Sequence, residues 1–454
     1  MRSASLLVTL CIAGLLVAPA GASAGGFYAS AVGARAGAMG GAFIGLADDY
    51  SAVYWNPAGA TRIEGAQLTV TGADFLPLAS REGWISFEGA DIGGARVASE
   101  IQATSDVKHF FAPGAFLYVD PGPARVLFDK IGVCFYTLAD HGVFWDGSEV
   151  YDDIIEAYGT DPSYEEGYRQ VMGDPPDFQS RVTGYSVSPV FAKDFGPSFS
   201  LGVAGNFVYG RFEYMTGSWH EETFEDSSRL HPYQFEEDLK GWAYGATVGA
   251  MYRVSDDVSI GAVVRTPMTF SLEGDVAVSS TWEDYVSPSQ TEDFELTFPL
   301  WAGAGLAYRN FLADGLTMTA DIDYTQWSAV DEIVRTTDEE LPLGLGTTTL
   351  DWEDAIGFGV GFDYRLSQAA SLRLGYHSSP SQTPDETFDF ALPQTAHDIV
   401  TLGFGYRSKA WLADVSLEYA AGQSVELGFG PDTETLGDNL HDVIVPTLSF
   451  TYFF

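Results

Sequence analysis

The chain ends in the stretch Val443-Ile444-Val445-Pro446-Thr447-Leu448-Ser449-Phe450-Thr451-Tyr452-Phe453-Phe454. From Ile444 onward every second residue is apolar, and the opposite face carries Thr447, Ser449 and Thr451. This period of two predicts a β-strand with one apolar and one polar face. The same alternation recurs at 316–324 and 411–419, where the polar faces include aspartate and glutamate. Such faces are too polar for the interior of a β-sandwich.

Two architectures accommodate alternating strands of this kind. A soluble antiparallel sheet turns its apolar face inward, whereas a membrane β-barrel turns it toward lipid and keeps a wet lumen. The aromatic carboxyl end of the chain, Tyr452-Phe453-Phe454, resembles that of outer-membrane barrels and favours the second. An interfacial girdle of aromatic residues at the strand ends is also typical of such barrels. The residues expected in this girdle are Tyr118, Trp242, Tyr252, Trp301, Tyr308, Trp327, Tyr406 and Trp411.

The spacing of the alternating segments predicts the topology. Short and long connections alternate along the chain, as expected for periplasmic turns and outer loops, and they predict an all-β, antiparallel transmembrane barrel of about fourteen strands. The long loops are expected near 78–107, 141–180, 213–238, 275–292, 329–350, 378–396 and 421–441. The strands are expected to start near residues 66, 108, 129, 181, 197, 239, 257, 293, 315, 351, 368, 397, 409 and 442.

The first 24 residues have the pattern of an export signal. Arg2 precedes an apolar run from Leu6 to Val17, and Ala22-Ser23-Ala24 forms a small-residue cleavage site. We therefore expect a signal peptide at 1–24, a separate glycine-rich segment at 25–65 and the barrel at 66–454. The predicted location is the outer membrane of a Gram-negative-type bacterium, crossed many times.

The charge of the chain limits its partners. The formal net charge is −41, with 22 Lys and Arg against 63 Asp and Glu, which excludes a basic face for nucleic acid. Many of the acidic residues stand in the expected loops 141–180 and 213–238. We expect these loops to face outer-membrane lipid and glycolipid, with divalent cations as bridging partners. The twelve-residue calcium pattern is missing, and no dedicated metal site is predicted.

The segment before the first strand carries a family resemblance. Residues 33–49 read GARAGAMGGAFIGLADD, and residues 50–59 read YSAVYWNPAG. This run resembles the amino-terminal hatch of the FadL-type outer-membrane transporters of long-chain fatty acids and hydrocarbons (OMPP1/FadL/TodX). The resemblance implies a fourteen-stranded barrel plugged by the hatch. It also implies a ligand that enters from outside, binds in apolar sites and leaves sideways through a gap beside a kinked strand.

Several residues follow as candidates for the hatch and gate. Glycine reaches positive φ at low cost and permits close packing in a crowded lumen. Asn56 can satisfy backbone groups in the turn that Pro57 fixes, and aspartates can pair with a lumen arginine or cap a helix. The predicted hatch and gate residues are Gly40, Gly41, Asp48, Asp49, Asn56, Pro57 and Ala58, with ligand contacts expected near Gly25, Gly26 and Phe27.

The ligand is less well defined by sequence. The partner expected from the resemblance is a long-chain fatty acid or another hydrophobic small molecule, bound by apolar burial. A carboxylate head would need Lys or Arg, for which Arg35, Lys108, Arg211 and Arg265 are the candidates. The acidic chain makes neutral hydrocarbons or aromatics an alternative.

Two other functions remain open at this stage, a general porin for polar solutes and a structural or receptor barrel such as an adhesin or phage receptor. The chain shows no HExxH, G-x-S-x-G or P-loop motif. We therefore expect neither an enzyme nor a cofactor.

Overall fold

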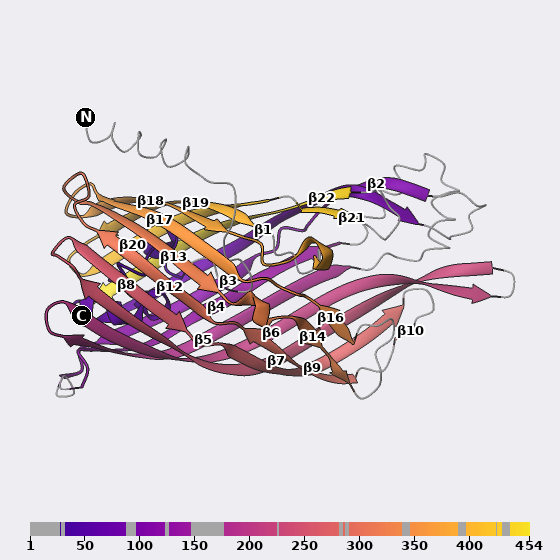
Figure 1. The fold of residues 1–454 in the computed structure, drawn as a ribbon, viewed down its shortest axis with the longest axis horizontal. Helices are drawn as coiled ribbons and strands as arrows, with labels where there is room; N and C mark the ends of the chain where they lie inside the picture. Colours follow the sequence, from indigo (N-terminus) through magenta and orange to yellow (C-terminus); the bar gives the residue numbers. More distant parts are fainter. Residues whose placement is uncertain are drawn as a thin grey trace.

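The computed structural model describes residues 28, 32–87, 97–122, 127–146, 177–224, 227–280, 285–286, 290–337, 346–388, 396–423, 425–428 and 436–454. These residues form a closed antiparallel β-barrel (Figure 1), in which β1 (Gln67–Phe87) pairs with both β3 (Phe110–Val119) and the last strand, β22 (Leu436–Phe453). Among them we count fourteen barrel strands, with β8 and β9 forming one and β11 and β12 another. The prediction of a fourteen-stranded barrel is therefore confirmed.

The other barrel strands follow in chain order, and each pairs with its neighbours in sequence. They are β4 (Lys130–Trp145), β5 (Phe178–Phe195), β6 (Phe199–Phe224), β7 (Ser227–Arg253), β8 (Val258–Arg265) with β9 (Met268–Ser280), β11 (Gln290–Phe298) with β12 (Trp301–Tyr308), β13 (Leu316–Thr325), β17 (Ala355–Arg365), β18 (Ala370–Ser379), β19 (His397–Arg407) and β20 (Trp411–Gly422). Smaller elements on the loop side are β2 (Val97–Thr104), β10 (Tyr285–Val286), η3 (Trp327–Ala329), β14 (Glu332–Val334), β15 (Thr336–Thr337), β16 (Thr347–Thr349), η5 (Asp385–Thr387) and β21 (Val425–Gly428).

The two faces of the strands separate as the alternation predicts. In β22 the side chains of Leu448 and Phe450 are exposed on the outer surface, whereas Ser449 and Thr451 are buried. In β20 the inward Asp414 is 1% exposed, and its outward neighbour Val415 is 44% exposed. An apolar outer wall around a polar interior is the arrangement required of a barrel in lipid.

Two double strands are interrupted where proline enters the ladder. Pro267 separates β8 from β9, and Pro299 separates β12 from β11. Proline has no backbone N–H to donate to the ladder, although Pro189 and Pro446 are accommodated within β5 and β22. β8 pairs with β12 below the break and β9 with β11 above it, so both interruptions lie at the same height in the wall.

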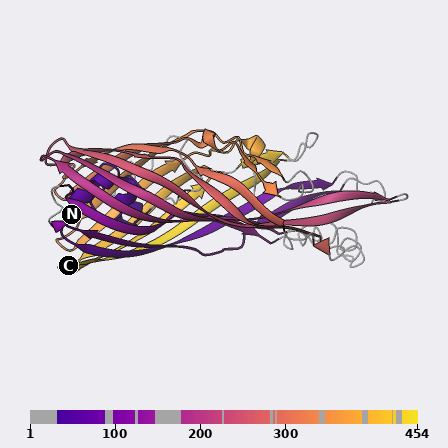
Figure 2. The same ribbon diagram turned by 90° about the horizontal axis from the view of Figure 1, so that it is seen from below.

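Two expectations from sequence need correction. The stretches 78–107 and 213–238, both expected as loops, are largely strand. β1 runs on to Phe87 and pairs with β2, and β6 and β7 continue as a paired hairpin that projects beyond the other strands (Figure 2). The polar and acidic residues of these stretches hide the apolar alternation in the sequence, so the pattern alone ends the strands too early. Tyr118, Trp301 and Trp327 are also buried rather than exposed in a girdle, whereas Trp242, Tyr252, Tyr308 and Tyr406 are exposed.

Residues 32–63, which we call the N-terminal segment, pack inside the barrel. The segment contains α2 (Ala34–Gly37), α3 (Ala52–Trp55) and η1 (Pro57–Arg62), all short, and most of its side chains are fully buried. It lies toward the end of the barrel where the short turns and the C-terminus are found (Figure 1). The described helices include none long and apolar enough to cross a membrane.

Candidate functional site

Asn56 joins the N-terminal segment to the barrel wall. Its side-chain amide donates hydrogen bonds to Ile44 O and to Ala250 O of β7, each at 3.1 Å. Its carbonyl accepts from Ala58 N at 3.1 Å, which caps η1. Asn56 is completely buried, so loss of this side chain leaves backbone carbonyls without partners. The sequence-based expectation that Asn56 satisfies backbone groups is confirmed.

Glycines in the wall allow the segment to approach the strands. A Cβ built on Gly249 of β7 lies 2.1 Å from Asn56 Oδ1, and one on Gly202 of β6 lies 2.2 Å from Pro57 C. Within the segment, Gly40 has φ 63° and its Cβ would meet the backbone of Tyr376 at 2.8 Å. Only glycine combines this conformation with such close contact.

Polar side chains of the strands complete the docking. Asp321 of β13 accepts a hydrogen bond from Ile44 N at 2.6 Å, and Thr401 of β19 accepts from Gly40 N at 3.0 Å. Ser259 of β8 donates to Gly45 O at 2.8 Å. The segment is therefore held by backbone contacts to strands on several sides of the lumen.

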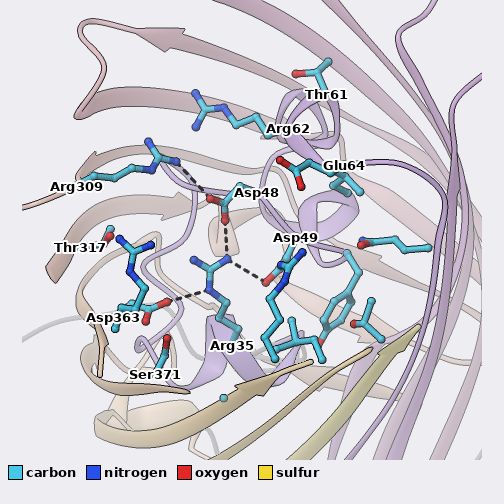
Figure 3. A pocket seen from close by; sticks show the side chains of 18 of the residues that line it. Arg35, Asp48, Asp49, Thr61, Arg62, Glu64, Arg309, Thr317, Asp363 and Ser371 are labelled. Atoms are coloured by element: carbon cyan, nitrogen blue, oxygen red, sulfur yellow. Dashed lines mark hydrogen bonds and ion pairs between the residues drawn. The ribbon is translucent and has the colours of Figure 1, made fainter. Parts of the chain in front are cut away.

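A network of charges lies on the turn side of the segment (Figure 3). Arg35 donates to Asp48 at 2.6 Å and to Asp363 of β17 at 3.1 Å, and Arg309, which follows β12, reaches Asp48 at 3.3 Å. Asp49 accepts from Ser51 at 2.6 Å. The predicted pairing of Asp48 with an arginine is confirmed, and both Arg35 and Arg309 take part.

The pKa shifts of this network follow from its burial. Burial opposes the charge on Asp48, but Arg35 and Arg309 outweigh it and lower the pKa of this carboxyl. Burial raises the pKa of Asp49, and the neighbouring Arg35 and Ser51 offset only part of this rise. Burial and the neighbouring Arg309 cation lower the pKa of Arg62 to about 10. These groups line a cavity of about 960 Å³ that we call the turn-side cavity.

A second cavity, the inner cavity, lies on the loop side of the segment. Its volume is about 140 Å³. Aromatic and aliphatic side chains supply one part of its lining, and histidines and carboxylates supply the other. The lining includes Tyr28, Tyr54, Trp55, Phe75, Phe110, Trp301, Ile399 and Val445, together with Asp140, His141, Asp323, His377, His397, Glu418 and His441.

The barrel wall beside the inner cavity is interrupted. The β3–β4 ladder ends at the pair Gly114 and Tyr136, although β4 continues along β5 to Trp145. The β4–β5 register shifts between Thr137 and Ala139, which marks a bulge at Leu138. Beyond that point Phe110 of β3 covers Gly142 of β4, where an added Cβ would lie 2.7 Å from the phenyl ring.

The positions of the sequence-based candidates can now be compared. Gly40, Gly41, Asp48, Asp49, Asn56, Pro57 and Ala58 all lie in the segment inside the lumen. Gly25, Gly26 and Phe27 lie outside the described residues. Of the arginine candidates, Arg35 belongs to the charge network and Arg265 is buried against aromatic rings, whereas Arg211 pairs with Asp238 and Lys108 with Asp106, away from both cavities.

The histidines and Trp301 of the inner cavity were not predicted. They are spread over β4, β12, β18, β19 and β22, so no short motif contains them. The sequence offered only a weaker signal than a motif, namely a single histidine or tryptophan at an inward position of each of these strands.

Comparison with known proteins identifies the family. A model of the outer membrane protein transport protein family (OMPP1/FadL/TodX) matches residues 154–453, more than half of the chain. The chain belongs to this family. No curated protein matches the chain.

Solved structures share the fold of this FadL-family chain. A FadL homologue of Pseudomonas aeruginosa aligns with a TM-score of 0.72 at 16% identity, covering 94% of this chain and 99% of that one. The toluene transporter TodX of Pseudomonas putida aligns at 0.68 with the same identity and coverage. The toluene transporter TbuX of Ralstonia pickettii aligns at 0.60 and 16% identity, covering 92% and 98%. At this identity the likeness establishes the fold, and with the family match it places the chain in the outer membrane.

Proposed function

We propose that this FadL-family chain carries hydrophobic molecules of single-ring size across the outer membrane, through the inner cavity and past the N-terminal segment. The inner cavity is the observation that carries the proposal. An apolar cavity of about 150 Å³ holds one benzene molecule, and the inner cavity has about 140 Å³ with Tyr54, Trp55 and Trp301 in its lining. An extended long-chain fatty acid needs far more room, so we favour aromatic ligands over it.

The N-terminal segment acts as the hatch in this proposal. Tyr54 and Trp55 line the inner cavity and directly precede Asn56, which ties the segment to β7. A ligand that displaces these two rings therefore also strains the hydrogen bonds by which Asn56 holds the hatch to β7. Gly40 and Gly41 permit its close contacts, and Asp48 and Asp49 belong to the charges beneath it.

The ligand leaves sideways between β3 and β4. Phe110, Asp140 and Gly142 line both the inner cavity and the stretch where these strands lack ladder pairing. Opening there requires movement of side chains such as Phe110 rather than rupture of a continuous ladder. The chain shares its fold with two structures named as toluene transporters, and this likeness supports an aromatic ligand.

The test is uptake of radiolabelled toluene, palmitate and maltose by cells that carry the chain or lack it. Toluene uptake that depends on the chain is expected, with maltose unaffected. Gly142→Phe crowds Phe110 over the lateral gap, since even a Cβ there would lie 2.7 Å from the phenyl ring, and it is expected to reduce toluene uptake at least tenfold in barrels that still assemble. Gly205→Phe, on the outer face of β6, is the matched control. Chain-dependent maltose uptake would instead support a general porin, and equal uptake by Gly142→Phe would exclude lateral exit.

A porin or receptor role finds less support. The described part of the lumen is filled by the N-terminal segment, which is difficult to combine with an open aqueous pore. No observation on the described residues favours a receptor.

A further inference from the structure

The polar part of the inner cavity has an unusual composition. Four of the seven histidines of the chain, from four different strands, line this one small cavity. The rings of His141 and His397 each lie 5.7 Å from the ring of His441, measured between centroids. His397 Nε2 donates to His441 O at 2.7 Å, so one ring is already oriented.

One of these polar side chains lacks hydrogen-bond partners among the described residues. His441 is 2% exposed, and neither of its ring nitrogens has a partner among the described residues. Asp140 is 4% exposed and is already engaged, since Arg181 lies 3.6 Å away as an ion pair and the Thr183 hydroxyl also interacts with it. Buried polar groups without partners are costly, so His441 is suited to a polar group of a ligand.

Cations are missing from this lining. Within the described part of the chain, no lysine or arginine lines the inner cavity, whereas Asp140, Asp323 and Glu418 do. Arg265 lies behind the aromatic rings, 4.3 Å from the Tyr54 ring and 4.8 Å from the Trp301 ring, with its guanidinium donating to Tyr54 O. A ligand carboxylate in the cavity would therefore face other carboxylates.

We propose that the inner cavity selects single-ring compounds that carry a neutral hydrogen-bond donor, such as a phenolic hydroxyl, over both hydrocarbons and aromatic carboxylates. The ring packs on Tyr54, Trp55 and Trp301, and the hydroxyl donates to a ring nitrogen of His441. Among the described residues no group of three or more His, Cys, Asp or Glu is arranged to hold a metal ion. This inference rests on the proposed function.

A matched set of ligands tests the proposal by calorimetry on the full chain in nanodiscs. p-Cresol and p-xylene have nearly the same shape and differ in one hydroxyl, and p-toluate adds a negative charge. We expect p-cresol to bind at least tenfold more tightly than p-xylene, and p-toluate to bind most weakly. A site built to bond a hydroxyl strongly disfavours the analogue without it.

The variant His441→Leu is expected to reduce the preference for p-cresol over p-xylene to less than threefold while p-xylene still binds. His109→Leu, at an exposed position, is the control and keeps the preference. Equal binding of p-cresol and p-xylene by the unaltered chain, or an unchanged preference in His441→Leu, overturns the inference and leaves the proposed function intact. Binding of none of the three ligands overturns both.

Discussion

The two sides of the N-terminal segment differ in how they are held. On the turn side, Arg35, Asp48 and Asp363 make charged contacts of about 3 Å beside a wide cavity. On the loop side, aromatic rings meet a cavity about one seventh as large. Charged contacts are directional and costly to break when buried, whereas apolar contacts adapt to different occupants. The comparison favours a segment that is anchored on its turn side, and it places the proposed response to ligand on the loop side.

The largest expected effect comes from removing the central cation. Arg35→Ala leaves Asp48 with Arg309 alone and Asp363 with Arg373 alone, and loss of the central cation from these partly buried pairs destabilises the docked segment. We expect a looser segment and a several-fold rise in ion conductance through single barrels in planar bilayers. Arg365→Ala, at an exposed position on the same cavity, is the control and should conduct like the unaltered chain. Unchanged conductance in Arg35→Ala would show that the turn side does not anchor the segment.

Asn56 tests the connection between the two sides. Asn56→Ala removes two donated hydrogen bonds and one cap, at a cost of about 2–3 kcal/mol. Toluene uptake should fall while barrel assembly is unchanged. Asn56→Asp retains the cap to Ala58 N but loses the donors to Ile44 O and Ala250 O, so it should resemble Asn56→Ala if the tether matters. Normal uptake in both variants would remove Asn56 from the gate.

Close backbone contact is the third test of how the segment is held. Gly249→Ala places a Cβ 2.1 Å from Asn56 Oδ1, and overpacking of this kind costs about 1–3 kcal/mol. Gly184→Ala, also inward-facing, meets its nearest atom at 3.4 Å and serves as the control. Accelerated proteolysis within residues 32–63 is expected in Gly249→Ala alone. Equal cleavage in both variants would mean that the contact is not needed for docking.

The membrane-embedded wall of the barrel was predictable from sequence, because lipid contact on its outer face imposes a period of two on the strands. The start of β13 at Leu316 was predicted within one residue of its position for this reason. Where lipid contact ends, as in the β6–β7 hairpin, the pattern no longer distinguishes strand from loop. The buried Trp301 shows the same limit, since an aromatic residue near a strand end fits a girdle or a lumen equally well.

The site divides in a similar way. Asn56 and the glycines could be predicted because they stand in one continuous motif, and the backbone conformation of that motif is set by neighbouring residues. The partners of that motif, such as Asp321 and Asp363, and the histidines of the inner cavity come from strands far apart in the chain. Their convergence depends on barrel register, which a single sequence leaves undetermined.

The smallest expected effect is a pH dependence with two opposite arms. The pKa of Asp48 is lowered in the docked segment, so its contribution to docking is present above the free carboxyl pKa of about 3.9 and is lost as pH falls through the docked value. The pKa of Asp49 is raised, so its contribution is present at low pH and is lost as pH rises through the docked value. Ion conductance should therefore pass through a shallow minimum near the free carboxyl pKa of about 3.9, where both contributions are present, and should change by roughly twofold or less on either side. Asp49→Asn should abolish the rise above this pH, and Asp48→Asn the rise below it. A conductance that does not change with pH in any of the three proteins would mean that neither carboxyl changes its environment when the segment moves. The charged turn side would then stay in place, and only the aromatic loop side of the segment would move.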